Sequence, residues 1–358
     1  MKISTSLTRA ARFALFGVAL SGIAAATPTA QAVAAEEVNL YSYRQPFLIE
    51  PLLARFTAET GIKVNVVFAN KGMLEKIKAA GANNPADAVL TVDIGRLYGL
   101  KQAGVLAPVE SDVLNTNVPA NLRDPNGLWF GLTTRARIAL VSKERVTEGE
   151  LTSYEDLAAP KFKGRICIRS GKNAYNVALI ASMIAHHGED ATRTWLEGVK
   201  NNLARKPQGN DRAQAKAVYE GQCDIAIANT YYMAKMQTND EKPEQKKWAE
   251  AVRVTFLNQG ATARGTHVNV SGAGVLKGAK NRDNAIKLIE WLSGDEAQKT
   301  YAEVNFEYPV KAGVAVADIV KAWGDFKADT LSMEEIAKQR EAATRLVDQV
   351  NFDEGPTS

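Results

Sequence analysis

Residues 224–232 read DIAIANTYY, and this stretch decides the fold class. Its first five residues form a short, largely apolar run of the kind that becomes a buried β-strand. Asn229 and Thr230 follow directly, and either residue can cap the start of a helix. Tyr231 and Tyr232 are then expected at the amino end of that helix. A strand that passes directly into a helix is typical of an α/β fold.

The same alternation of strand and helix begins near the start of the chain. Apolar patterns predict strands at 38–41, 62–68 and 88–92 and helices at 73–80 and 97–103, with a first helix that contains 47–56 and ends at Gly61. Gly61 and Gly104 follow two of these helices, as glycine does at helix ends. One face of the first helix is expected to be buried: Phe47, Leu48, Leu52, Leu53 and Phe56. Such repeated units predict a mostly parallel sheet.

A second series of strands and helices follows Thr134. It predicts strands at 138–141, 165–169 and 224–228 and helices at 175–187, 192–202 and 213–220. Two apolar passages, 129–140 and 252–257, are expected to carry the chain across and back as a hinge. We therefore predict two α/β domains, composed of residues 35–133 with 258–308 and of residues 134–257 with 309–358.

The first 34 residues have the features of an export signal. Three cations, Lys2, Arg9 and Arg12, precede an apolar run of 14 residues, and a small-residue motif follows it at 30–32. The run is shorter than the roughly 18 residues that span a bilayer. We predict a signal peptide at 1–34 and a periplasmic protein that is not inserted in the membrane.

Removing this segment lowers the formal net charge from +4 to about +1, because three cations and no anions are lost. Charged residues of both signs are scattered along the rest of the chain. This charge distribution gives no basis for binding nucleic acid. We expect a monomer.

The two cysteines, Cys167 and Cys223, both lie in apolar, strand-like runs. An oxidising compartment favours a disulfide between them, and two buried free thiols are the alternative. A catalytic thiol is disfavoured because no neighbouring histidine is apparent from the sequence.

Enzyme signatures are missing from the sequence. It contains no G-x-S-x-G, no H-E-x-x-H, no Walker loop and no C-x-x-C. Of its three histidines, His186 and His187 precede Gly188 at a predicted helix end, where polar rings suit exposed carbonyls. His267 is expected to make local hydrogen bonds. We therefore expect neither an enzyme nor a histidine-based zinc site.

Three tyrosines share one predicted position, the start of a helix that follows a strand. Tyr175 occupies this position after the strand at 165–169, as Tyr231 and Tyr232 do after theirs. Ligands of open α/β sheets bind beyond the carboxyl ends of strands, and helix starts stabilise anions there. A phenol has a pKa near ~10, so its ionisation at neutral pH requires this field and a highly charged cation. Ferric iron suits phenolate oxygen, while aromatic packing or a sugar-stacking surface is the alternative.

Six stretches of the chain resemble the bacterial periplasmic ferric-ion-binding proteins. They are YSYRQP at 41–46, GLTTRAR at 131–137, RSGKNAYN at 169–176, GNDR at 209–212, DIAIANTYY at 224–232 and FEYPV at 306–310. The resemblance runs in order through the whole mature chain. It implies a two-domain, transferrin-like fold of the periplasmic binding protein type II class with an interdomain cleft. It also implies Fe³⁺ in that cleft, bound by Tyr175, Tyr231 and Tyr232 and delivered to the inner-membrane permease of an ABC transporter.

The first strand departs from the pattern of many family members, which carry Tyr-Ser-x-Arg-His-Tyr. Here Gln45 and Pro46 stand where a histidine and a tyrosine would bind iron. The resemblance therefore implies the subgroup that completes the iron shell with a synergistic anion, such as carbonate, or with water. Arg135 is the candidate anion anchor through two parallel N–H bonds, assisted by Thr133 and Thr134. A surface salt bridge is the alternative role for Arg135.

Two further residues, Arg44 and Gln45, are expected beside the iron site without binding the metal. Two rival functions remain at this point. A solute-binding protein for a polyamine, thiamine or a sugar would need an acidic or tryptophan-rich cleft, and the five tryptophans do not cluster at the predicted strand ends. A secreted hydrolase would need a catalytic constellation, and none is apparent.

Overall fold

The computed structural model describes residues 36–69 and 71–356. The predicted signal peptide, 1–34, lies outside the described residues. The chain from Glu36 onward forms one compact unit, so the boundaries between the two proposed domains stay a prediction. No helix in the part of the chain that the structure describes combines the length and the apolar character needed to cross a membrane.

The described residues build one ten-stranded sheet. Its main path runs β2 (Lys63–Phe68), β1 (Glu37–Ser42), β3 (Ala88–Thr91), β9 (Val268–Leu276), β5 (Phe130–Ser142), β7 (Ile225–Asn229) and β6 (Ile166–Cys167). Three short strands extend it: β4 (Leu106–Ala107) on β9, and β8 (Val252–Thr255) and β10 (Tyr308–Pro309) on β5.

The sheet is mixed, so the expectation of a mostly parallel sheet is wrong. Only the pairs β1–β2, β1–β3 and β6–β7 are parallel. These are the strands of the predicted βαβ units, because parallel neighbours need a long crossover connection such as a helix. The pairs that join the units through β5 and β9 are antiparallel.

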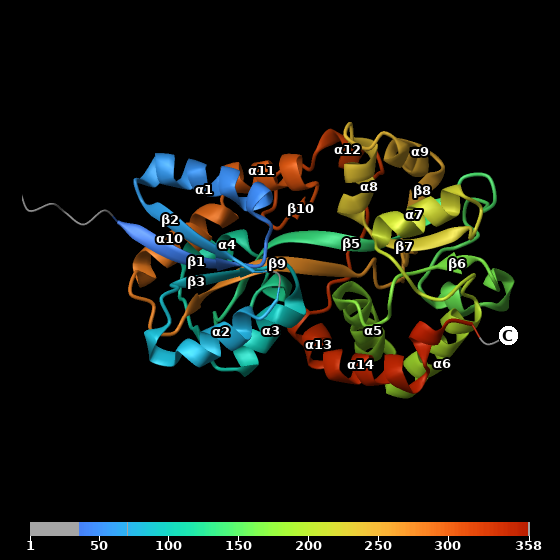
Figure 1. Ribbon diagram of the computed structural model, residues 1–358, viewed down its shortest axis with the longest axis horizontal. Helices are drawn as coiled ribbons and strands as arrows, with labels where there is room; N and C mark the ends of the chain where they lie inside the picture. Colours follow the sequence, from blue (N-terminus) through green and yellow to red (C-terminus); the bar gives the residue numbers. More distant parts are fainter. Residues whose placement is uncertain (1–35, 70, 357–358) are drawn as a thin grey trace, which may run out of the picture. The chain divides into compact units, whose positions relative to one another are not determined.

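β5 and β9 lie side by side at the middle of the sheet and connect its two ends (Figure 1). The first predicted crossing passage, 129–140, corresponds to β5. The second, 252–257, was placed wrongly: β8 pairs only with β5, and β9 is the strand that reaches β3. Two glycines in β9 explain the error, because glycine weakens a strand pattern. A Cβ at Gly272 would meet the Phe130 carbonyl oxygen at 2.4 Å, and one at Gly274 would meet that of Leu128 at 2.6 Å.

One group of helices packs around the β1 end of the sheet (Figure 1). It comprises α1 (Pro46–Thr60), α2 (Met73–Ala80), α3 (Ile94–Gln102), α4 (Asp112–Asn117), α10 (Arg282–Ser293) and α11 (Asp295–Asn305). α1 ends at Gly61, whose φ of 74° is in the left-handed region that glycine adopts without strain. Its buried face contains Ile49, Leu52, Leu53 and Phe56. Phe47 was predicted on this face but is 66% exposed.

A second group packs around the β6 end of the sheet (Figure 1). It contains α5 (Ala174–His187), α6 (Glu189–Asn201), α7 (Asp211–Tyr219), α8 (Thr230–Gln237) and α9 (Glu244–Glu250). The C-terminal helix α14 (Arg340–Gln349) packs on α5 and α6, and α13 (Met333–Lys338) contacts both α5 and α3. A disulfide joins Cys167 of β6 to Cys223, just before β7, with the two Cα atoms 5.9 Å apart.

Candidate metal centre

The structure brings the three predicted tyrosines together. Tyr231 and Tyr232 lie in the first turn of α8, directly after β7, and their ring centroids are 4.4 Å apart. Tyr175 lies in the first turn of α5, where its backbone N–H donates to the side chain of Asn173. The hydroxyl of Tyr231 donates to that of Tyr175 at 3.1 Å. Helix starts that follow different strands thus present phenol oxygens to one point.

The predicted side-chain cap of α8 is wrong. Asn229 occupies the cap position but makes no capping hydrogen bond. Its side-chain oxygen accepts instead from Arg137 at 3.0 Å, and the hydroxyl of Thr230 accepts from the backbone N–H of Ala136 at 3.3 Å. Both side chains therefore fix the start of α8 to β5, which positions the tyrosine pair.

The phenols line a pocket of about 260 Å³. Its walls come from both groups of helices and from the central strands: Tyr43, Arg44, Gln45, Leu48, Val92, Arg135, Tyr175, Tyr231, Tyr232, Lys235, Asn305 and Glu307. Gln45 lies between β1 and α1 and lines this pocket. The first strand therefore leads to the pocket, as expected when Gln45 and Pro46 were compared with the iron-binding histidine and tyrosine of other family members. Lys235, Glu307 and Asn305 were not predicted as site residues.

Burial keeps Tyr231 and Tyr232 protonated when no cation is bound. It is the largest cause that raises the pKa of Tyr231 well above its usual value, and the neighbouring Tyr175 and Tyr232 raise it further. Burial, Tyr175 and Asp211 also raise the pKa of Tyr232. The expected field of the helix starts does not outweigh these effects. A metal must therefore displace the phenol protons when it binds.

Arginines pack behind the phenols and share one buried carboxylate. Asp211 is fully buried and accepts from Arg137 at 2.6 Å and from Arg169 at 3.0 Å. The guanidinium of Arg169 lies 5.2 Å from the centre of the Tyr175 ring, and that of Arg212 lies 4.9 Å from the centre of the Tyr232 ring. Arg212 comes from the stretch 209–212, and against the larger effect of burial the charge of Arg169 lowers the pKa of Tyr232.

Arg135 is buried beside the pocket, with only 2% of its surface exposed. It donates to the hydroxyl of Ser271 and to the backbone carbonyl of Val92, and no carboxylate of the described residues pairs with it. The alternative of a surface salt bridge is therefore wrong. The hydroxyl of Thr133 donates to Glu307 at 2.6 Å and is not directed to an anion on Arg135.

Two other charged residues complete the pocket. Arg44 is buried and pairs with Glu307 at 2.8 Å, and the same guanidinium nitrogen donates to Ser271. Burial lowers the pKa of Lys235, against the opposing effect of Glu307. The pocket therefore contains three cations and one carboxylate.

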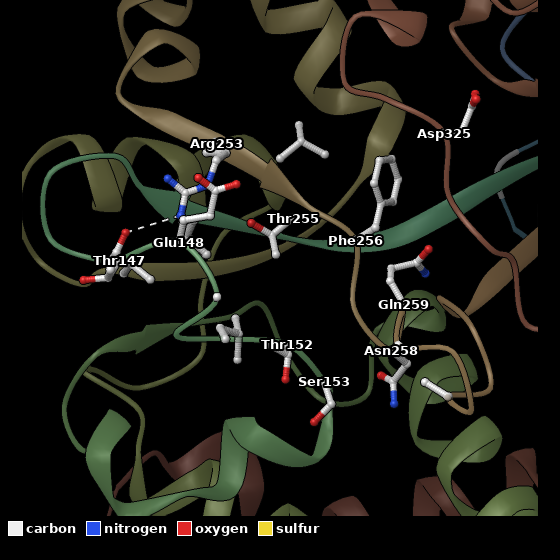
Figure 2. A pocket seen from close by; sticks show the side chains of 17 residues that line it. Thr147, Glu148, Thr152, Ser153, Arg253, Thr255, Phe256, Asn258, Gln259 and Asp325 are labelled. Carbon is white, nitrogen blue, oxygen red and sulfur yellow. Dashed lines mark hydrogen bonds between the residues drawn. The ribbon is translucent and has the colours of Figure 1, made fainter.

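A larger cavity of about 650 Å³ lies elsewhere, between the segments 146–153 and 253–260 (Figure 2). No tyrosine lines it. Its polar side chains, among them Arg253, Thr255 and Gln259, are spread along the walls (Figure 2). This arrangement offers no set of donors for a metal.

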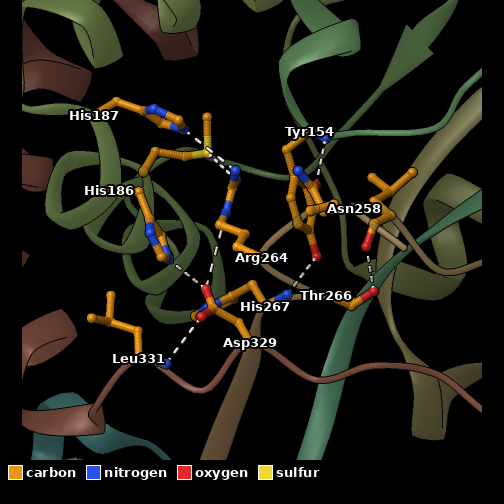
Figure 3. Close-up of polar contacts among 12 residues, drawn as sticks. Tyr154, His186, His187, Asn258, Arg264, Thr266, His267, Asp329 and Leu331 are labelled. Carbon is orange, nitrogen blue, oxygen red and sulfur yellow. Dashed lines mark hydrogen bonds and ion pairs between the residues drawn. The ribbon is translucent and has the colours of Figure 1, made fainter. Parts of the chain in front are cut away.

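None of the three histidines lines the pocket of the phenols, and all three belong to a separate group of polar contacts (Figure 3). His186 pairs with Asp329 at 2.7 Å, and His187 with Glu155 at 2.8 Å. Arg264 lies between them and pairs with both carboxylates. The ring of His267 is buried, and neither of its nitrogens has a hydrogen-bond partner in the described part of the chain, so the expected local hydrogen bonds are absent.

No group of three or more His, Cys, Asp or Glu side chains in residues 36–69 and 71–356 is arranged to hold a metal ion. The three phenols are therefore the candidate protein ligands for a metal at this pocket. Phenolate is a hard oxygen donor, and three of them balance the charge of a trivalent cation. The donor set thus favours Fe³⁺ over softer or divalent ions.

Comparison with known proteins identifies the family of this chain. Residues 68–328 match the family described as bacterial extracellular solute-binding protein. Iron uptake protein A1 of Synechocystis sp. is 48% identical over 318 residues, which are 88% of each chain. The major ferric iron-binding protein of Neisseria meningitidis serogroup B is 29% identical, over 95% of this chain and 98% of the relative.

Solved structures give the same result for the fold. Ferric iron-binding protein A of Mannheimia haemolytica, in an open conformation, has a TM-score of 0.84 at 53% identity over 89% of this chain and 99% of that chain. A Trichodesmium protein in complex with iron and citrate ligands has a TM-score of 0.85 at 46% identity over 88% and 99%. These likenesses confirm the predicted α/β fold of two-domain periplasmic binding proteins.

Proposed function

Since this chain belongs to the bacterial extracellular solute-binding proteins and is related to their ferric-iron-binding members, we propose that it captures Fe³⁺ in the periplasm. It then delivers the ion to the inner-membrane permease of an ABC transporter. The observation that carries the proposal is the meeting of three phenols in one pocket. The described residues offer no cluster of three or more carboxylate, histidine or cysteine side chains that could hold the ion instead.

Tyr175, Tyr231 and Tyr232 act as the iron ligands, each as a phenolate. The short distance between the hydroxyls of Tyr231 and Tyr175 supports a shared metal. The guanidinium groups of Arg169 and Arg212 support ionisation of the phenols once the cation arrives. Fe³⁺ with three phenolates has no net charge, so the bound ion adds little electrostatic energy to a buried site.

A synergistic anion, with carbonate as the first candidate, completes the iron shell. Gln45, between β1 and α1, has no charged or imidazole group to bind iron, and Arg135 lines the same pocket and pairs with no carboxylate of the described residues. A guanidinium has five N–H donors, so the two bonds that Arg135 already makes leave donors for an oxyanion. The Trichodesmium relative was solved with iron and citrate together, which supports an anion beside the metal.

Export by the signal peptide at 1–34 and a two-domain division at the boundaries given above belong to the same proposal. The division allows the pocket walls to close over iron and to separate at the permease. The protein acts as a monomeric carrier and catalyses no reaction.

An absorption spectrum tests the proposal. The purified protein, titrated with ferric citrate at neutral pH, should develop a visible phenolate-to-iron charge-transfer band that saturates at one iron per chain. The variant Tyr231→Phe should lose most of this band and keep its far-ultraviolet circular dichroism. A wild-type protein that stays colourless, or a Tyr231→Phe variant with an unchanged band, would overturn the proposal.

A further inference from the structure

The charges that line the pocket do not balance. Arg44 and Glu307 form an ion pair at 2.8 Å and cancel each other. Arg135 and Lys235 also line the pocket, and neither has a carboxylate within 4.0 Å among the described residues. Two cations thus face the place where a trivalent cation is expected to bind.

Lys235 lies on the same face of α8 as the iron ligands. It follows Tyr231 by four residues and Tyr232 by three, and these spacings bring side chains together on a helix. Its ammonium group is 5.8 Å from the centre of the Phe47 ring, which belongs to α1 on the opposite wall. An aromatic face attracts a cation but does not take its N–H bonds. The ammonium group therefore keeps donors for a bound anion.

An unpaired ammonium group in a half-buried site is unfavourable, because it loses hydration without gaining a counter-charge. A buried cation of this kind is stabilised when an anion binds beside it. The net charge of the site then determines the charge of the anion that fits it. Iron and three phenolates sum to zero, so Arg135 and Lys235 leave two positive charges, which a dianion neutralises and a monoanion does not.

From this count we infer that Lys235 is a specificity-determining residue of the iron site, which selects a doubly charged oxyanion as the partner of Fe³⁺. The inference rests on the proposed function and extends it from the presence of an anion to its charge. Arg135 holds one end of the anion, and Lys235 neutralises the second charge from the α8 wall. Both cations line the same pocket of about 260 Å³.

The test compares a dianion with a monoanion. Bicarbonate-free protein receives a substoichiometric amount of fresh acidic ferric chloride at neutral pH, and oxalate or formate is titrated while the charge-transfer band is recorded. Wild type should reach half of the full band at a lower concentration of oxalate than of formate. In Lys235→Gln the half-saturating concentration of oxalate should rise roughly tenfold to a hundredfold, as for loss of one charge-assisted contact. That of formate should change by about twofold, the size of a surface substitution effect.

Two variants serve as controls. Lys235→Arg keeps the charge and should retain the preference for oxalate, whereas Lys242→Gln removes an exposed lysine and should behave as wild type. Equal shifts for oxalate and formate in Lys235→Gln, or no shift for either, would overturn the inference while the iron site stands. A wild-type protein without a band in any anion would overturn the proposed function as well.

Discussion

The hydroxyl of Tyr231 donates to the hydroxyl of Tyr175 at 3.1 Å, across 56 residues of sequence. One residue lies in the first turn of α8 and the other in the first turn of α5, so the contact depends on the sheet that aligns the ends of β7 and β6. The parallel pairing of these strands places both helix starts at the same sheet edge. The position of the proposed iron site thus depends on the order of the strands in the sheet.

Removal of one phenol oxygen should weaken iron binding and leave folding intact. Loss of a residue that hydrogen-bonds to a metal ligand lowers metal affinity roughly tenfold to a hundredfold. Tyr232→Phe removes a ligand itself, so we expect its ferric affinity to fall by more than this. Competition against a chelator measures the change. Tyr219→Phe, at a tyrosine that is 47% exposed, is the matched control and should bind iron as wild type does. Equal affinities of both variants would exclude Tyr232 from the site.

Iron binding should release protons, because burial raises the pKa of Tyr231 and of Tyr232 and both phenols are protonated before the metal arrives. Each that becomes a ligand gives up one proton, so affinity should fall as pH falls. A pH-stat titration of unbuffered protein with ferric ion measures the release. Tyr232→Phe should release one proton fewer than wild type. An equal release from both proteins would contradict phenolate ligation by Tyr232.

The phenols were predictable because each lies at the start of a helix that follows a strand, Tyr231 and Tyr232 within three residues of β7 and Tyr175 within eight of β6. Such local patterns are visible in a single sequence. Lys235 offered a weaker signal, its spacing of four and three residues from the tyrosine pair. Glu307 offered none. It reaches the pocket because the chain after α11 returns to pair β10 with β5. This return brings Glu307 within hydrogen-bond distance of Thr133, which lies 174 positions earlier in the sequence.

The incorrect predictions about the fold have a similar origin. β9 escaped detection because Gly272 and Gly274, which its neighbours require for close approach, weaken the strand pattern. Phe47 was assigned to the core because apolar periodicity does not distinguish a buried face from the rim of a pocket. It lies beside Lys235, where an exposed ring has a role that periodicity does not reveal.

Replacement of Arg135 by alanine should lower ferric affinity by about tenfold to a hundredfold, because one charge-assisted contact to the anion is lost. The dependence of iron binding on added bicarbonate should disappear, while the tyrosinate colour persists in weaker form. Titrations with and without bicarbonate measure both effects. Gln45→His is the complementary variant, since a donor at the end of β1 should reduce the need for an anion. Equal bicarbonate dependence in wild type and Arg135→Ala would exclude Arg135 as the anchor.

The buried ring of His267 should make the protein sensitive to acid. Burial, together with Arg137 and Arg264, lowers the pKa of His267 to about 3. An unfolded histidine has a pKa near ~6.5, so between these values the unfolded chain binds a proton that the folded chain does not. The contribution of His267 to stability is therefore present above pH ~6.5 and is lost as the pH falls towards 3.

His267→Gln removes this titration. Wild type should lose about 2 kcal/mol more unfolding free energy than the variant when the pH falls from ~7.5 to ~5. Urea unfolding at both pH values measures the difference, and the values at the higher pH correct for altered packing in the variant. Other titrating groups, such as Glu155 with its pKa lowered to about 2, are present in both proteins and cancel. If wild type and variant lose the same amount of unfolding free energy, His267 is protonated in the folded protein and the prediction is wrong.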